Sequence, residues 1–225
     1  GVATTVSIDH ATPASFYAHQ VDRNMSYEIA LDLIKADFDF YAGGGFAKPH
    51  TTFDRKEAPS IYPQFEEAGY AVARGLDEYK EKAATAKKMI LMQNEKDGTS
   101  LAHAIDRDED DMTLADLTSS AIEFLTKGKN NGFFLMVEGG KLDYAAHEQD
   151  AVTTFYEVRE FAQTVELALE FAKQHPRETL IVVTSDHETG GMSLGWDHYE
   201  VRMNLLAAQK SSALQVTNLI QQMRA

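Results

Sequence analysis

The 225-residue chain is 44% apolar and 25% charged, which is enough apolar surface for one sizeable core. Its 21 Lys and Arg against 35 Asp and Glu give a net charge of −14, which disfavours nucleic acid as a partner. The absence of cysteine excludes thiol catalysis, disulfides and Cys-ligated zinc, and no apolar stretch approaches the ~20 residues that span a bilayer, so we also expect no membrane partner.

Strand and helix patterns alternate through the first half of the chain. The β-branched run Val2–Ile8 predicts a strand, and Pro13 suits the first turn of a helix that reaches about His19. The further elements expected here are helices over Tyr27–Lys35, Pro63–Ala68 and Leu76–Thr85, strands over Phe38–Ala42, Tyr70–Ala73 and Lys88–Leu91, a surface excursion over Phe46–Ser60 and a loop over Asn94–Ser100.

The second half continues the alternation. Thr113 and Asp116 resemble a capping box, with Asp in place of Glu or Gln, and predict the start of a helix. The other expected elements are a break over Lys127–Asn131, buried strands over Phe133–Val137 and Thr179–Thr184, a long helix over Thr153–Gln174 and terminal helices over Tyr199–Ala208 and Leu214–Met223.

The alternation of strands and helices predicts an α/β fold with a mostly parallel central sheet and flanking helices. We expect residues 1–225 to form a single α/β domain. The first residues lack a Met and read as a strand already under way, so this domain is expected to be part of a longer chain. The long helix is expected to turn its apolar residues inward: Phe155, Val158, Phe161, Ala162, Val165, Leu169 and Ala172.

The first buried run ends in residues able to bind a metal. Glu138 and two glycines follow Phe133–Val137 directly, and Asp143 and His147 come next at i, i+4 spacing. If the chain turns helical after Gly140, these two side chains share one face and lie close enough to hold one cation. Ligands gather where buried parallel strands end, so we expect the site at this edge of the sheet.

The second buried run, Thr179–Thr184, ends in Asp186 and His187. Alone this dipeptide is a weak indication of a metal site, because such pairs are common in surface loops. Together the two runs supply two imidazoles and two carboxylates, ligands suited to zinc in an open catalytic site. Glu138 and Thr12 carry oxygen donors only and match a hard ion such as magnesium.

These motifs resemble those of the alkaline phosphatases, particularly the bacterial ones. Val137–His147 is similar to their central metal-binding segment, and Thr184–Gly191 is similar to their second. Ser7–His19, with Arg23 after it, is similar to the segment that carries the magnesium threonine and the phosphate-binding arginine. The resemblance extends from Gly1 to about Leu194 and implies an alkaline-phosphatase-like α/β fold.

The resemblance also implies a role for each matched residue. The implied activity is hydrolysis of phosphate monoesters, with inorganic phosphate as product, through two zinc ions and one magnesium ion. The two zinc ions would stabilise the attacking and leaving oxygens. Asp143 and His147 would bind the first zinc, Asp186 and His187 the second, and Glu138 and Thr12 the magnesium. Arg23 would bind two phosphate oxygens through its planar fork. Secondary roles would fall to His10, near the magnesium, and to Tyr144, which would contact phosphate through water.

Two parts of the family pattern are missing. No nucleophilic-serine motif lies upstream of Thr12, and His198 comes too soon after Asp186 and His187 to be the family's third zinc histidine. We therefore expect a catalytically incomplete fragment, with a phosphoserine intermediate only in the full-length parent. The alternatives are a metal- or phosphate-binding chain without catalysis, and another metal-dependent hydrolase of the same superfamily, a sulfatase or a phosphodiesterase.

Structural explanations stay open for single residues. His10 and Thr12 could cap a helix, and Thr12 before Pro13 suits the N-cap position. Arg23 suits a surface ion pair with Asp22 or Glu28, and Glu138 could cap the next helix. By resemblance, the protein is periplasmic or secreted. Homodimers are common in the family, although several apolar residues near the C-terminus suit a core or a partner equally: Leu205, Leu206, Leu214 and Ile220.

Overall fold

The computed structural model describes residues 1–93, 99–128, 132–191 and 202–224. The chain divides into two compact units. The first unit comprises Gly1–Leu101 and Asp110–Glu138, and the second comprises Ala102–Glu109 and Gly139–Ala225. The expectation of a single domain over residues 1–225 stays a prediction.

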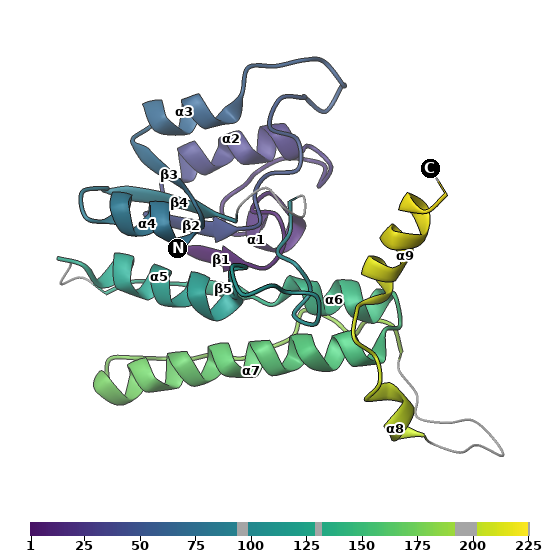
Figure 1. Ribbon diagram of the computed structural model, residues 1–225. Helices are drawn as coiled ribbons and strands as arrows, with labels where there is room; N and C mark the ends of the chain where they lie inside the picture. The colour runs from purple at the N-terminus through teal and green to yellow at the C-terminus, as the bar shows by residue number, and fades with distance from the viewer. Residues whose placement is uncertain (94–98, 129–131, 192–201, 225) are drawn as a thin grey trace. The chain divides into compact units, whose positions relative to one another are not determined.

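The first unit is built on a five-stranded parallel sheet with the order β3-β4-β2-β1-β5 (Figure 1). The strands are short and apolar, and helices connect most of them, as parallel neighbours require. Their bounds are β1 Val2–Thr4, β2 Phe40–Gly43, β3 Tyr70–Arg74, β4 Lys88–Met92 and β5 Met136–Glu138. The predicted α/β fold with a mostly parallel sheet is confirmed.

Helices cover both faces of this sheet. Side chains of successive strand residues alternate between the faces, so Tyr41 packs with α1 to α3, whereas Phe40 and Ala42 pack with α4 and α5. The capping box predicted at Thr113 and Asp116 is present at the start of α5. The helix bounds are α1 Ala11–Ala14, α2 Ser26–Ala36, α3 Ile61–Glu67, α4 Gly75–Ala83 and α5 Leu114–Thr126.

Two strands are shorter than the sequence predicted. After Thr4 the backbone leaves the sheet and bonds to the loop after β2, through Gly44 N–H to the Val6 carbonyl. β5 begins only at Met136, because Met136 is the residue that pairs with Val2, where β1 begins. The prediction that Phe133 and Phe134 are buried strand residues is therefore wrong, and Phe134 is 65% exposed.

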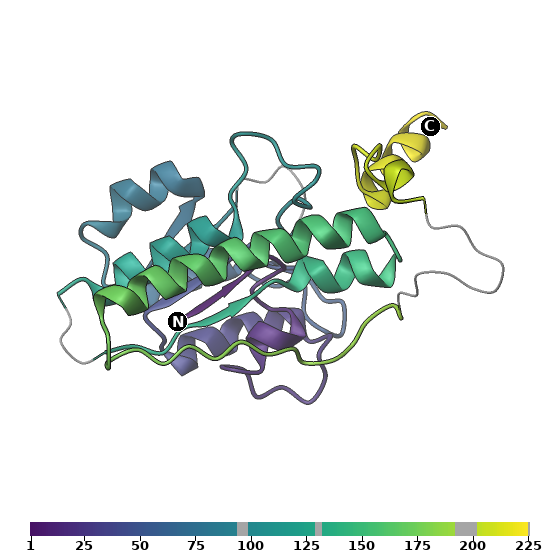
Figure 2. The same cartoon turned by 90° about the horizontal axis from the view of Figure 1, so that it is seen from below.

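The second unit is helical. α6 Gly140–His147 lies beside α7 Ala151–Gln174, as both views show (Figures 1 and 2). The short α8 Met203–Leu206 and α9 Ala213–Gln222 follow. Residues 199–201 of the predicted helix over 199–208 lie outside the described residues, as do residues 94–98 of the predicted loop and residues 129–131 of the predicted break.

The inward face predicted for α7 is wrong. Phe155, Val158 and Leu169 are exposed, whereas Glu157 and Glu160 are buried. The reason is a polar network with the segment 102–109. Glu157 binds His103 Nδ1 at 2.9 Å, and both carboxylate oxygens of Glu160 accept from the Arg107 guanidinium, at 2.7 and 2.9 Å. These buried hydrogen bonds direct the polar side of α7 inward within this unit. His103, which lacks a motif around it, is a buried structural residue.

The predicted strand over Thr179–Thr184 does not form. Leu180 is 87% and Val182 75% exposed, and the chain after α7 runs as a plain trace without a strand arrow in Figure 2. A strand exists only when a neighbouring strand satisfies its backbone groups. No strand among the described residues pairs with this segment. Within the same described part of the chain, no helix is long and apolar enough to cross a membrane.

Candidate metal centre

The first motif places its two candidate ligands on one helix. β5 ends at Glu138 and α6 begins at Gly140, so the chain turns helical where the sequence predicted. The i, i+4 spacing puts Nε2 of His147 3.6 Å from Oδ1 of Asp143. Both side chains are accessible to solvent, with 69% of His147 and 34% of Asp143 exposed, so both can meet an ion from solution.

In the second motif, Asp186 and His187 face each other. Nε2 of His187 lies 3.3 Å from Oδ2 of Asp186. Two ligands of a tetrahedral zinc ion, each bound at ~2.0–2.2 Å, are separated by roughly 3.3–3.6 Å. Both His–Asp pairs have this separation, and their donor types are those of open zinc sites. The residues present therefore fit zinc.

The hydrogen bonds of His187 define which ring nitrogen can bind a metal. Nδ1 lies 3.1 Å from the carbonyl oxygen of Glu188 and 3.1 Å from the hydroxyl oxygen of Thr189. The carbonyl can only accept, so this contact is satisfied by the tautomer that carries its proton on Nδ1. In that tautomer the lone pair lies on Nε2, the nitrogen that faces Asp186. This assignment of the tautomer by the partner of the other nitrogen is typical of metal-binding histidines.

Thr189 connects the two motifs. Its hydroxyl donates to Oδ1 of Asp143 over 2.7 Å, while its oxygen contacts His187. Gly190 permits this approach, because its φ is +82° and a Cβ there would lie 2.1 Å from the carbonyl oxygen of Ala146 in α6. Any side chain at this position would collide with α6. A glycine is therefore needed for the second motif to lie against the first.

Each His–Asp pair supplies two protein ligands. Across residues 1–93, 99–128, 132–191 and 202–224, no group of three or more His, Asp or Glu side chains converges as a metal site. His198, which the sequence analysis rejected as a third ligand, lies outside these ranges. The assignment of Asp143, His147, Asp186 and His187 as zinc ligands stays a prediction. Tyr144 lies on α6 beside Asp143, and its ring lies 5.4 Å from Nζ of Lys141.

The oxygen donors expected for magnesium belong to the first unit. Glu138 ends β5, where the hydroxyl of Thr4 donates to its Oε2 over 2.5 Å. Thr12 lies inside the single turn of α1, and His10 occupies the N-cap position, so the N-cap explanation of Thr12 is wrong. α1 packs beside β5, the strand that Glu138 ends. Carboxylate and hydroxyl oxygens on neighbouring elements fit a hard cation.

Arg23 lies exposed in the segment between α1 and α2. The carboxylates proposed above as ion-pair partners have other contacts. Asp22 accepts from the backbone and side-chain amides of Asn24 at 2.8 and 2.9 Å, and Glu28 accepts from the backbone of Phe53 at 3.1 Å. Because Arg23 is exposed, its guanidinium is accessible to an anion from solution.

Asp9 is a buried carboxyl group next to His10. Both of its oxygens accept from the backbone N–H of Ala47, at 3.2 and 3.1 Å. Burial raises the pKa of Asp9 to about 6, against the lowering effect of its hydrogen bonds from Ser7 and Ala47. The carboxyl group joins the loop after β1 to the loop after β2.

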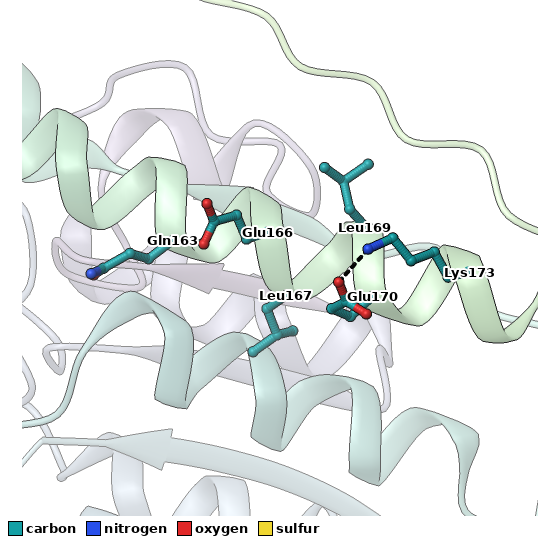
Figure 3. Close-up of a pocket in the computed structure, with 6 residues that line it drawn as sticks. All are labelled: Gln163, Glu166, Leu167, Leu169, Glu170 and Lys173. Atoms are coloured by element: carbon teal, nitrogen blue, oxygen red, sulfur yellow. Dashed lines mark hydrogen bonds and ion pairs between the residues drawn. The ribbon is translucent and has the colours of Figure 1, made fainter.

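Figure 3 shows an open hollow on α7 that is separate in sequence from both motifs. Lys173 and Glu170 form an ion pair at its edge, at 2.5 Å. The hollow is lined by Gln163, Glu166, Leu167, Leu169, Glu170 and Lys173. It contains no imidazole and no motif residue, so we assign it no part in the candidate site.

Thr4, Asp9 and Thr189 were not predicted as functional residues from the sequence. Thr189 stands inside the second motif, so a hydroxyl two residues after a candidate histidine ligand was a usable signal. Thr4 could be found only from the pairing of β1 with β5, which places it opposite Glu138. Asp9 differs from a surface aspartate only in its burial, which a single sequence does not reveal.

A parallel α/β unit followed by two His–Asp pairs defines an α/β protein with candidate metal ligands. The sequence model of the alkaline phosphatase family matches residues 1–221, and the chain belongs to that family. It is 38% identical over 203 residues to alkaline phosphatase 3 of Bacillus subtilis, covering 88% of this chain and 41% of that protein.

Solved structures agree with this assignment. The alkaline phosphatase of Thermus thermophilus matches with a TM-score of 0.80 and 30% identity, over 97% of this chain and 46% of that one. A variant of the alkaline phosphatase from the Antarctic bacterium TAB5, solved with Mg bound in its M3 site, matches with a TM-score of 0.73 and 34% identity, over 85% of this chain and 52% of that one. The chain spans about two fifths of the length of the first curated relatives it matches.

Proposed function

We propose that this chain carries part of the active site of a phosphate monoester hydrolase that uses two zinc ions and one magnesium ion. The observation that carries the proposal is the hydrogen-bond path from Asp143 through Thr189 to His187, which joins the two His–Asp pairs. Membership of the alkaline phosphatase family supports the reaction class.

The residues divide into two donor sets. Asp143 with His147, and Asp186 with His187, offer nitrogen and oxygen donors for zinc, which when bound would stabilise the attacking and leaving oxygens of a phosphoryl transfer. Glu138 and Thr12 offer only oxygen, as magnesium prefers, and the TAB5 variant with Mg in its M3 site supports a magnesium site in the family. Secondary positions near these donors fall to His10 and Tyr144.

Arg23 is proposed to bind the phosphate. Its planar guanidinium can donate two parallel hydrogen bonds to two phosphate oxygens, which a lysine cannot match in geometry. With a chain charge of −14, local cations are needed to make an anionic substrate or inorganic phosphate bind at all. No residue of the matched motifs has the role of the nucleophile, so a phosphoserine intermediate is proposed only for a chain that contains that segment.

A second candidate function is binding of metal and phosphate without turnover. It is favoured by the two-ligand pairs, since no three-ligand group forms among the described residues. A sulfatase or phosphodiesterase of the same superfamily is a further alternative, separable by a panel of sulfate, diester and monoester substrates. We also propose a periplasmic or secreted location and a homodimer as the assembly.

The test is metal content per chain by elemental analysis of dialysed protein, with p-nitrophenyl phosphate turnover at alkaline pH measured in parallel. His147→Ala and His187→Ala should each lower bound zinc, whereas His50→Ala, which removes an exposed histidine outside the motifs, should leave it unchanged. Equal zinc in all four proteins would refute the assignment. Zinc without phosphate release would support the metal- and phosphate-binding function instead.

A further inference from the structure

Thr4 contacts the candidate magnesium ligand Glu138 through the sheet itself. In the parallel pairing of β1 with β5, Thr4 is the direct partner of Glu138. The Thr4 hydroxyl donates to Oε2 of Glu138 over 2.5 Å, and Thr4 has no solvent exposure. A hydrogen bond to an ionised carboxylate is among the strongest that a hydroxyl can make.

The carboxylate partner determines the direction of this hydrogen bond, because a carboxylate oxygen accepts and the Thr4 hydroxyl therefore donates to it. The same hydroxyl oxygen is held by a second bond, since the backbone N–H of Val6 donates to it over 3.1 Å. The backbone of Glu138 is held as well, since its carbonyl accepts from Thr5 N–H over 3.2 Å. Thr4, at the end of β1, therefore holds the side chain of Glu138, and Thr5 directly after it holds the main chain.

We propose that Thr4 is a positioning residue for cation binding at Glu138, an inference that rests on the magnesium site proposed above. By holding Oε2, the Thr4 hydroxyl fixes the rotation of the carboxylate and keeps it in one orientation before a hard cation arrives. A carboxylate that must otherwise be ordered on binding would bind the cation more weakly. Thr4 itself acts through Glu138 and need not touch the metal.

The test uses the intact chain and Mn²⁺, a hard cation that suits oxygen sites and is visible by electron paramagnetic resonance. Thr4→Val removes the hydroxyl at nearly constant volume, and Thr4→Ser keeps it. Thr118→Val is the matched control, because Thr118 is also buried and its hydroxyl donates to the Leu114 carbonyl within α5. Thr4→Val should weaken Mn²⁺ binding about 10-fold, while Thr4→Ser and Thr118→Val should bind nearly as tightly as the original chain.

A second measurement needs no metal. The δ-carbon resonance of Glu138, assigned by its loss in Glu138→Gln, should shift in Thr4→Val and return in Thr4→Ser. If Thr4→Val does not fold, as urea unfolding would show, Thr4→Ala takes its place. Unchanged Mn²⁺ affinity without the hydroxyl, or an unchanged resonance, would overturn the role of Thr4. Equal Mn²⁺ binding by the original chain and Glu138→Gln would instead overturn the proposed magnesium site, and the positioning role with it.

Discussion

Replacing Asp9 with asparagine tests how strongly burial of one carboxylate makes stability depend on pH. Asp9 is 3% exposed, and burial raises its pKa from an ordinary 3.8 to about 6. Because the folded chain holds this proton more tightly than the unfolded chain, the protonated form stabilises the fold fully below about pH 3.8. That contribution is lost as the pH rises through about 6.

The magnitude follows from the same two values. The gap between 3.8 and about 6 corresponds to about 3 kcal/mol, at about 1.4 kcal/mol per pH unit. Asparagine does not ionise and can still accept a hydrogen bond from Ala47. Between about pH 3.5 and about pH 8, the unfolding free energy of Asp9→Asn should therefore rise by about 3 kcal/mol relative to that of the original chain. These two pH values lie on either side of the interval from 3.8 to about 6.

The assay is urea unfolding at both pH values, with Asp77→Asn as control because the Asp77 side chain is fully exposed on α4. The control should change in parallel with the original chain. If Asp9→Asn also keeps a constant offset from the original chain, Asp9 does not titrate with a raised pKa, and the argument from burial is refuted.

Three further predictions concern stability and the motif contact. Thr113→Ala removes one half of the capping box with Asp116 and should lower the unfolding free energy by about 1 kcal/mol in urea titrations, an effect that Thr113→Ser should largely avoid. Arg107→Ala leaves the Glu160 carboxylate without its guanidinium and should cost about 3 kcal/mol, and a double-mutant cycle with Glu160→Ala should show strong coupling; additive costs would contradict the paired arrangement. Gly190→Ala introduces a Cβ that α6 cannot accommodate and should speed amide hydrogen exchange across residues 187–191 and lower zinc content, whereas unchanged exchange would contradict the close approach.

The regular part of the fold was predictable from the sequence. Apolar runs such as Lys88–Met92 need both faces of a parallel sheet covered, and amphipathic helices such as Ser26–Ala36 supply the covering face. The i, i+4 placement of Asp143 and His147 was predictable for the same reason, since helix geometry alone fixes it. The local spacing of apolar residues is sufficient to predict a strand or helix wherever one repeating interaction determines its structure.

The spacing of apolar residues gives a wrong prediction where a contact between residues distant in the sequence determines the structure. The apolar residues of α7 predict the wrong inward face, because Glu157 and Glu160 find buried partners in a segment about fifty residues earlier. The apolar segment Thr179–Thr184 has the composition of a strand but no described neighbour to pair with. The local pattern of apolar residues contains no information about the contacts of Glu157 and Glu160 or about the pairing of Thr179–Thr184. A single sequence therefore predicts both segments incorrectly.

The candidate site shows the same division between local and long-range information. Two of its carboxylates, Glu138 and Asp143, each accept a hydrogen bond from a threonine hydroxyl, from Thr4 and Thr189 respectively. The carboxylates were found from motif spacing, whereas the contact of Thr4 with Glu138 is identified only by strand register, and that of Thr189 with Asp143 only by the packing of Gly190 against α6. A ligand's identity can thus be read from its motif, but its orientation depends on residues that only the folded chain brings near. Substitutions at these hydroxyls should therefore alter metal affinity while leaving every recognisable motif residue in place.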